Sequence, residues 1–264
     1  MKMNLTLAQQ IEERFPPYIS YGVMANPNQK YRKQGYRTLI VAVFPYSYPG
    51  DARLFSRYCS VYDYHTVVKE EFDRIFAPLG IEYRSFSDIS PFKEKVLAEE
   101  LGLGQIGKHN LLLTERYGSF VFVGEVLLKE ELPPKKHPAV SLCTGCGACQ
   151  RACPTNGLTD GFCRERCLSY LSQKKELSDA EIALFQKSEK VWGCDICQLA
   201  CPVNARANVT EIEKFQKPVL QLSEEEILGI SEDEFREKYR DFAFAYKGTE
   251  ILKRNVRLLH EKQI

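Results

Sequence analysis

The sequence lacks the features that would place a protein in a membrane, outside the cell or on a polyanion. None of its apolar stretches reaches the roughly 18 residues that a membrane-spanning helix needs. The first 15 residues contain no apolar core of a secretory signal, so we expect a reducing, cytoplasmic location and no disulfide framework. The 36 basic residues nearly balance the 35 acidic ones, so nucleic acid would have to be bound by a local basic patch.

What the sequence has in excess is cysteine, because nine of its ten cysteines lie between positions 143 and 201. The first run has the spacing C-x2-C-x2-C-x3-C-P, which is the signature of bacterial ferredoxins with two [4Fe-4S] clusters. Its members are Cys143, Cys146, Cys149 and Cys153, followed by Pro154. A second run, made of Cys194, Cys197, Cys201 and Pro202, repeats the C-x2-C and x3-C-P parts.

The fourth cysteine of such a run binds the other cluster, so each run contributes ligands to both. The prediction is a first cluster held by Cys143, Cys146, Cys149 and Cys201, and a second held by Cys153, Cys194, Cys197 and one further cysteine. Only Cys163 and Cys167 lie between the runs, and spacing does not choose between them. A zinc ribbon is the alternative, but tetrahedral zinc takes four ligands and would leave two cysteines of the first run unexplained.

The segment before the cysteines predicts alternating helices and strands. A helix from Asn4 to Phe15 precedes about 20 polar, turn-rich residues. The apolar run 38–44 predicts a buried central strand, and the loop 45–51 after it is of the kind that carries ligands in α/β sheets. A helix over 62–79, a strand over 81–86, a helix opened by Ser90 and Pro91, and a strand over 119–128 continue the pattern. We expect an α/β layer of about 130 residues, followed by a ferredoxin-like module.

Two further segments carry weaker predictions. The glycine-rich stretch from Gly102 to Gly107 is either a tight turn or backbone packed against a flat cofactor. After the cysteines, residues 212–239 predict two short helices, and residues 247–262 predict a helix with a local basic face formed by Lys253, Arg254 and Arg257.

Short motifs ahead of the cysteines resemble the epoxyqueuosine reductase family over residues 36–205. These motifs are Phe55-Ser-Arg-Tyr58, Asp63-Tyr-His65, Ser87-Asp-Ile-Ser-Pro91, the stretch 102–109, Gly118-Ser119 and Gly124-Glu125. The segment Cys167-Leu-Ser-Tyr-Leu171 looks like the family's isolated cysteine segment, so the resemblance assigns Cys167 to the second cluster. Gln105 and Val203 stand where the family usually has aromatic residues.

The resemblance implies an α/β (α+β) cobalamin-binding domain over 1–132, a ferredoxin-like double [4Fe-4S] domain over 133–210 and a short helical tail over 211–264. It implies reduction of epoxyqueuosine in a tRNA anticodon loop to queuosine by a monomeric chain, with electrons from an external low-potential donor. Relatives that act on tRNA continue into a helical-repeat domain, so a short member of the family is expected.

Asp88 is the proton donor that the resemblance implies, in the family's Asp-x-x-Pro motif; the plainer interpretation is that Asp88 helps Ser90 to cap a helix. The other residues placed near cobalamin are Leu112, Leu113, Thr114, Ser169, Cys194 and Asp195, with Lys108 facing either the cofactor or solvent. His65 and His109 are expected to be hydrogen-bonded structural groups, not cobalt ligands. Cys59 is expected to be an ordinary buried residue.

The sequence alone leaves three alternative functions open. The same reductive chemistry could act on a substrate other than tRNA. A ferredoxin-type electron carrier would need only about 60 residues, so the α/β layer and Asp88 argue against it. An activator of corrinoid proteins would have clusters and reductase activity but would hold no cobalamin of its own.

Overall fold

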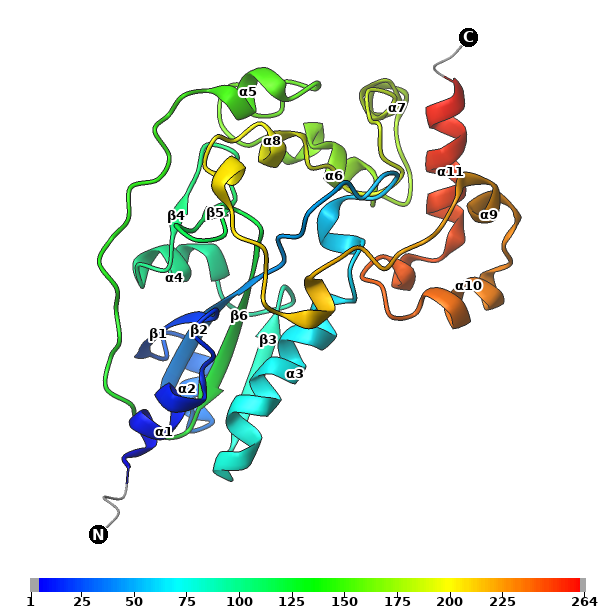
Figure 1. Ribbon diagram of the computed structural model, residues 1–264. Coiled ribbons are helices and arrows are strands. Elements are labelled where there is room, and N and C mark those ends of the chain that lie inside the picture. The colour runs from blue at the N-terminus through cyan, green and yellow to red at the C-terminus, as the bar shows by residue number, and fades with distance from the viewer. Residues whose placement is uncertain (1–4, 262–264) are drawn as a thin grey trace.

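The computed structural model describes residues 5–261 and is built around a four-stranded sheet with the order β1-β2-β6-β3 (Figure 1). The strands are β1 (Ser20–Ala25), β2 (Thr38–Pro45), β3 (Tyr83–Ser87) and β6 (Val121–Leu128). Every neighbouring pair is antiparallel. The strands predicted over 38–44, 81–86 and 119–128 are therefore confirmed, whereas β1 lies in a segment predicted to be turn-rich.

The alternation of strands and helices predicted an α/β layer without fixing strand direction, and adjacent strands of the sheet are antiparallel. β2 and β3 run in the same direction and are joined through α3 (Tyr64–Phe76), but β6 lies between them and runs the opposite way. This is a split β-α-β arrangement, which sequence order alone does not distinguish from a parallel sheet. Its consequence is that the ends of β2 and β3 and the start of β6 share one edge of the sheet.

Both faces of the sheet are covered, so β2 is buried at every position. α3 and α1 (Leu7–Arg14) pack on one face, and α4 (Glu94–Glu100) packs on the other. The residues of β2 alternate between the two cores, with Ile40 on the α3 face and Val41 on the α4 face. A β-carbon added at Gly124 would lie 2.8 Å from the Phe72 ring, so only glycine lets α3 approach β6 this closely.

Two helix starts differ from prediction. Asn4 lies outside the described residues, and Thr6 caps α1 with Gln9 in a reciprocal pair of hydrogen bonds. α4 begins at Glu94, not beside Ser90, because the Ser90 hydroxyl accepts the backbone N–H of Phe92 within a turn of its own. α3 ends as predicted, with a 3₁₀ turn and Gly80 at φ 65°.

The cysteine module consists of short helices joined by loops above the shared sheet edge (Figure 1). Its helices are α5 (Ala148–Ala152), α6 (Leu168–Leu171), α7 (Asp179–Phe185) and α8 (Ile196–Leu199). A two-stranded hairpin of β4 (Gln105–Ile106) and β5 (Leu112–Leu113) lies between the module and α4, and α2 (Gln29–Lys33) lies at the far end of the sheet.

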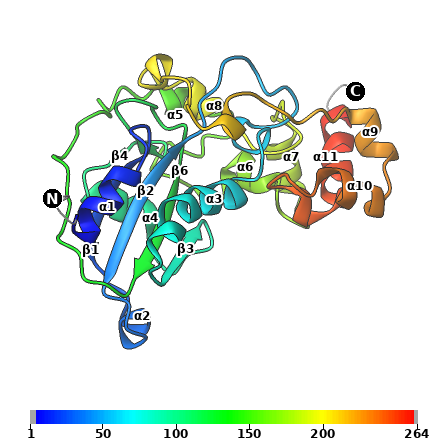
Figure 2. The same cartoon turned by 60° about the horizontal axis from the view of Figure 1, so that its bottom comes forward.

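The C-terminal segment forms α9 (Glu224–Gly229), α10 (Glu232–Tyr239) and α11 (Thr249–His260), which lie together to one side of the module (Figure 2). The two short helices predicted over 212–239 are thus confirmed. They pack around Phe55 and Trp192. The predicted basic face is partly used inside the chain, because Arg254 donates to the carbonyls of Lys174 and Lys175.

A helix long and apolar enough to span a membrane does not occur among residues 5–261.

A cavity between the sheet edge and the cysteine module

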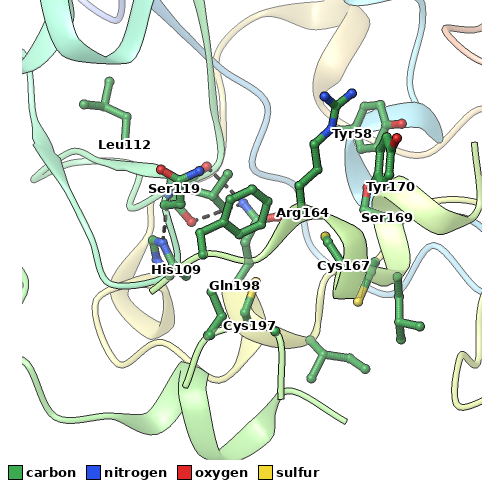
Figure 3. Close-up of a pocket in the computed structure, with 18 of the residues that line it drawn as sticks. Tyr58, His109, Leu112, Ser119, Arg164, Cys167, Ser169, Tyr170, Cys197 and Gln198 are labelled. Atoms are coloured by element: carbon green, nitrogen blue, oxygen red, sulfur yellow. Dashed lines mark hydrogen bonds between the residues drawn. The ribbon is translucent and has the colours of Figure 1, made fainter. Parts of the chain in front are cut away.

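The shared edge of the sheet and the cysteine module enclose a cavity of about 530 Å³. The sheet side contributes Tyr46 directly after β2, Asp88 directly after β3, and the start of β6. Tyr46 belongs to the loop that was expected to carry a ligand. Figure 3 shows side chains from the hairpin and the module converging on this space, among them Leu112, Ser169 and Gln198.

The second cysteine set lines this large cavity. Its members are Cys153, Cys167, Cys194 and Cys197, and Cys163 is not among the lining residues. The Cys163 thiol is directed instead to the Glu165 carboxylate, at 3.7 Å. The placement favours Cys167 over Cys163 as the eighth cluster ligand, a choice that cysteine spacing left open.

The first cysteine set lines a separate cavity of about 350 Å³. Its members are Cys143, Cys146, Cys149 and Cys201. Cys146 is exposed and Cys149 is buried, so this cavity reaches from the surface inward. Gln105 holds its entry in place, because the side-chain oxygen Oε1 of Gln105 accepts the backbone N–H groups of Leu142 and Cys143, each at 2.7 Å. An aromatic residue at position 105 could not do this.

Both cysteine sets suit cubane clusters. Within the described chain no three His, Cys, Asp or Glu side chains converge tightly enough to hold a single ion. Four cysteines instead surround each hollow, and a [4Fe-4S] cube presents one iron to each of four thiolates. Burial raises the pKa of the Cys194 thiol to about 12, so the positive charge of bound iron is needed to displace its proton.

Asp88 projects toward the large cavity from a strained turn after β3. Its φ is 61°, a left-handed conformation that aspartate tolerates better than most residues. The Nε2 atom of His65, on the first turn of α3, lies 3.7 Å from the Asp88 carboxylate, and Nδ1 of the same ring is 2.7 Å from Asp63. Each imidazole nitrogen therefore faces a carboxylate.

The His65 interaction decides the charge of this pair. It lowers the pKa of Asp88, against the raising effect of partial burial. Burial by itself lowers the pKa of His65, but the hydrogen bond to Asp63 and the nearby Asp88 carboxylate outweigh it and raise the pKa to about 9. At neutral pH the pair is an imidazolium beside a carboxylate, so its single proton resides on His65. A helix N-terminus plays no part, because α4 begins six residues after Asp88.

Two glutamates lie behind Asp88, Glu94 partly buried and Glu125 fully buried. Glu94, at the start of α4, lines the cavity, and burial together with the Asp88 charge raises its pKa to about 7. Glu125, in the middle of β6, is 0% exposed, and burial together with Glu94 raises its pKa to about 8. The sequence motif contained Glu125, but nothing in its local pattern showed that its carboxyl group is enclosed.

The residues that the resemblance placed near cobalamin divide into three groups. Asp88, Leu112, Ser169 and Cys194 line the large cavity. Lys108 and Leu113 line the smaller one, beside the first cysteine set. Thr114 and Asp195 line neither.

Thr114 and Asp195 stabilise the protein around the site. The Thr114 hydroxyl donates to the carbonyl of Gly118, 3.0 Å away, and closes a turn. Both Asp195 oxygens accept the backbone N–H of Arg57, at 3.2 and 3.0 Å, and Lys190 lies 3.8 Å away. Asp195 therefore joins the module to the loop after β2 and lines neither cavity.

The glycine-rich stretch and Cys59 both contribute to packing within the protein. A β-carbon at Gly102 would lie 2.3 Å from the His137 carbonyl oxygen, and one at Gly104 would lie 2.3 Å from that of Leu113. The glycines thus allow protein backbone, not a cofactor, to come close. Cys59 is fully buried beside Ser56, as expected.

The lining of the large cavity suits the chemistry of a corrinoid cofactor. Its volume lies in the range typical of ligand sites, and its walls come from two layers of the fold. Apolar side chains such as Leu112 and Ile196 provide flat surface, and Asn110, Ser169 and Gln173 can pair with the carboxamides that surround a corrin ring. The Nε2 atom of His109 is buried in this wall and bonds to none of the described residues.

Comparison with known proteins agrees with this architecture. Residues 142–204 match the 4Fe-4S double cluster binding domain family. An epoxyqueuosine reductase of Listeria monocytogenes is 32% identical over 222 residues, covering 80% of this chain and 58% of the relative. One of Escherichia coli is 34% identical over 189 residues, covering 68% of this chain and 50% of the relative.

The chain belongs to the epoxyqueuosine reductase family.

It spans about half to three fifths of the length of the curated relatives it matches. A crystal structure of an epoxyqueuosine reductase with an epoxyqueuosine-modified tRNA stem loop has the same fold, with a TM-score of 0.78 over 96% of this chain and 79% of that one, at 22% identity. The mixed α/β layer followed by a double [4Fe-4S] domain is therefore the family's fold.

Proposed function

We propose that the chain is a cobalamin- and iron-sulfur-dependent reductase that converts epoxyqueuosine in tRNA to queuosine. One observation carries the proposal: the carboxylate of Asp88 and the four cysteines of the second set face the same cavity. A reductive deoxygenation needs electrons and protons at one place, and this cavity brings their two sources together. The relatives named epoxyqueuosine reductase support the choice of substrate.

Clusters bound by the two cysteine sets would carry electrons from the protein surface to the large cavity. The first set reaches the surface at Cys146, where an external low-potential donor could approach. The second set, with Cys167 as its eighth ligand, borders the large cavity. Cobalamin, when bound, would supply a cobalt centre that acts as a strong nucleophile or one-electron reductant. Leu112, Ser169 and Gln173 are the residues that we propose hold it.

Asp88 would deliver a proton to the substrate oxygen. The proton is stored on His65 at neutral pH, because the pKa of Asp88 is lowered and that of His65 is raised to about 9. Binding of substrate and cofactor over Asp88 removes water from its carboxylate, and desolvation favours its neutral form. The His65 proton then passes to Asp88, which acts as the general acid.

The tRNA would meet cations at the mouth of the cavity. Arg164 lines the cavity and lies over the ring of Tyr170, at 4.2 Å from its centroid (Figure 3). A guanidinium stacked on an aromatic ring is suited to a phosphate or a nucleobase. Because Arg254 of the predicted basic face is used internally, Arg164 is the better candidate for contact with the anticodon loop.

A single-turnover assay tests the proposal. The protein is reconstituted anaerobically with iron, sulfide and cob(II)alamin, reduced chemically, and given an epoxyqueuosine-containing anticodon stem-loop or the free nucleoside. Formation of queuosine in the stem-loop is expected. Conversion of the nucleoside alone would indicate a substrate other than tRNA. Failure to retain the corrinoid would refute the proposal and leave an electron carrier or a corrinoid activator.

A further inference from the structure

We propose that Glu94 and Glu125 form a proton reservoir behind Asp88 that supplies the second proton of the reaction. The proposal rests on the proposed function, and it assigns a role to two carboxyl groups that do not hold the cofactor or bind iron. It is carried by the position of three acidic side chains in a row, from the cavity wall to the interior of the sheet.

The stoichiometry demands a second proton. Removal of an epoxide oxygen breaks both C–O bonds, forms one C=C bond and releases the oxygen as water, consuming two electrons and two protons. The electrons would be supplied by the clusters that the two cysteine sets would hold, together with the corrinoid that the large cavity would hold. The Asp88–His65 pair holds one proton at neutral pH, so one turnover takes one more proton than this pair contains.

Glu125 places a carboxyl group in an apolar part of the protein interior. It belongs to β6 and pairs with Val41 of β2 and Phe86 of β3, in the apolar layer that α4 covers. Neither of its oxygens accepts a hydrogen bond from a described residue. The Ser90 hydroxyl favours the charged form of this carboxyl group, but burial outweighs it and favours the neutral acid, so this side chain is a place where a proton is held.

Glu94 connects this buried group to the cavity. It lines the cavity wall together with Asp88, and one of its oxygens has no hydrogen-bond partner among residues 5–261. Its charge is coupled to that of Asp88 on one side and to that of Glu125 on the other. The three carboxyl groups therefore form a continuous series, and each lies close enough to influence the proton of the next.

The surrounding charged groups do not neutralise the two glutamates. The groups that act on the series from the packed elements are Tyr64 and His65 of α3, Lys95 of α4, His109 of the hairpin and the hydroxyl of Ser90. Lys95 donates to the carbonyl of Asn110 at 2.5 Å. Burial, followed by the Lys95 charge, lowers the pKa of His109 to about 4, so His109 is neutral.

The sequence of transfers follows from this arrangement. Asp88 receives the His65 proton and gives it to the substrate oxygen. A second proton then passes from Glu94 to Asp88 and onward to the oxygen, which leaves as water, and Glu125 reprotonates Glu94. Before the next turnover, Glu125 recovers its proton from solvent by way of Glu94, which lines the open cavity, and His65 recovers the proton that it gave to Asp88.

Infrared spectroscopy of the reconstituted protein tests the reservoir without any substrate. At about pH 6.5 we expect carboxylic-acid C=O bands for both glutamates, because an ordinary glutamate is ionised there. Glu125→Gln and Glu94→Gln should each remove one band and keep the cluster absorption. The control Glu71→Gln, at a buried glutamate of α3 that pairs with Arg74 away from the cavity, should remove neither. Unchanged bands in both reservoir variants would overturn the proposal.

The pH profile of single turnover tests the role in the reaction. Glu125→Gln should match the parent protein at about pH 6, where solvent supplies protons, and fall roughly tenfold behind it near pH 7.5. A constant ratio across pH would mean a structural role and would overturn the proposal. If the parent protein does not convert the stem-loop, the proposed function fails, and the infrared bands still decide whether the two carboxyl groups store protons.

Discussion

Replacement of Glu125 by glutamine should change the pH dependence of stability, whatever the substrate of the enzyme. An ordinary glutamate has a pKa of 4.5, and in the folded chain burial and Glu94 raise that of Glu125 to about 8. Below about pH 4.5 the group is neutral in both states, so its burial is not penalised. As pH rises toward 8 the unfolded chain ionises and the folded chain does not, so the free energy of unfolding falls.

The magnitude follows from the difference between the two pKa values. At 1.36 kcal/mol per pKa unit, the full loss between about pH 4.5 and about pH 8 is roughly 5 kcal/mol. Between about pH 5.5 and about pH 8 it is roughly 3 kcal/mol. For a chain of this size about 1 kcal/mol corresponds to about 2 °C in Tm, so the difference amounts to about 6 °C.

Glutamine has nearly the same shape and does not ionise, so Glu125→Gln removes this loss. The Tm of the reconstituted protein should be measured anaerobically at a fixed scan rate, because unfolding releases the clusters and is not reversible. The advantage of Glu125→Gln over the parent should grow by about 6 °C between about pH 5.5 and about pH 8. An advantage that is the same at both pH values would show that Glu125 does not hold a proton in the folded chain.

Three further predictions concern the site. Asp88→Ala should retain both clusters and the corrinoid but lose at least roughly 100-fold in single-turnover rate, the size of a general-acid contribution; full activity would remove Asp88 from the mechanism. Cys167→Ala should lower iron content by about one cluster while Cys163→Ala should not, and the reverse result would exchange their assignments. Gln105→Ala leaves two backbone N–H groups without an acceptor, so the first cluster should be lost faster to a chelator than in the parent, with the second cluster unaffected as the internal control.

Much of the site could be predicted because the binding of an iron-sulfur cluster requires a particular spacing of cysteines along a short stretch of chain. The run C-x2-C-x2-C-x3-C-P places three thiolates around one cube, and this requirement acts over a dozen residues of chain. The crossing of Cys153 and Cys201 between the two sets follows from the same rule, and the structure places each with the expected partners. Strands such as β2 were predictable because a strand buried on both faces is apolar at successive positions.

The tertiary structure decided the electrostatics and the order of the strands. Asp88 was recognised by its motif, but its charge depends on His65, which belongs to α3, more than 20 residues earlier in the chain. Insertion of β6 between β2 and β3 made the neighbouring strands antiparallel and carried Glu125 into an apolar layer. Sequence therefore determined which groups are ligands, whereas folding determined which groups hold protons, because a pKa depends on neighbours and burial that no local pattern records.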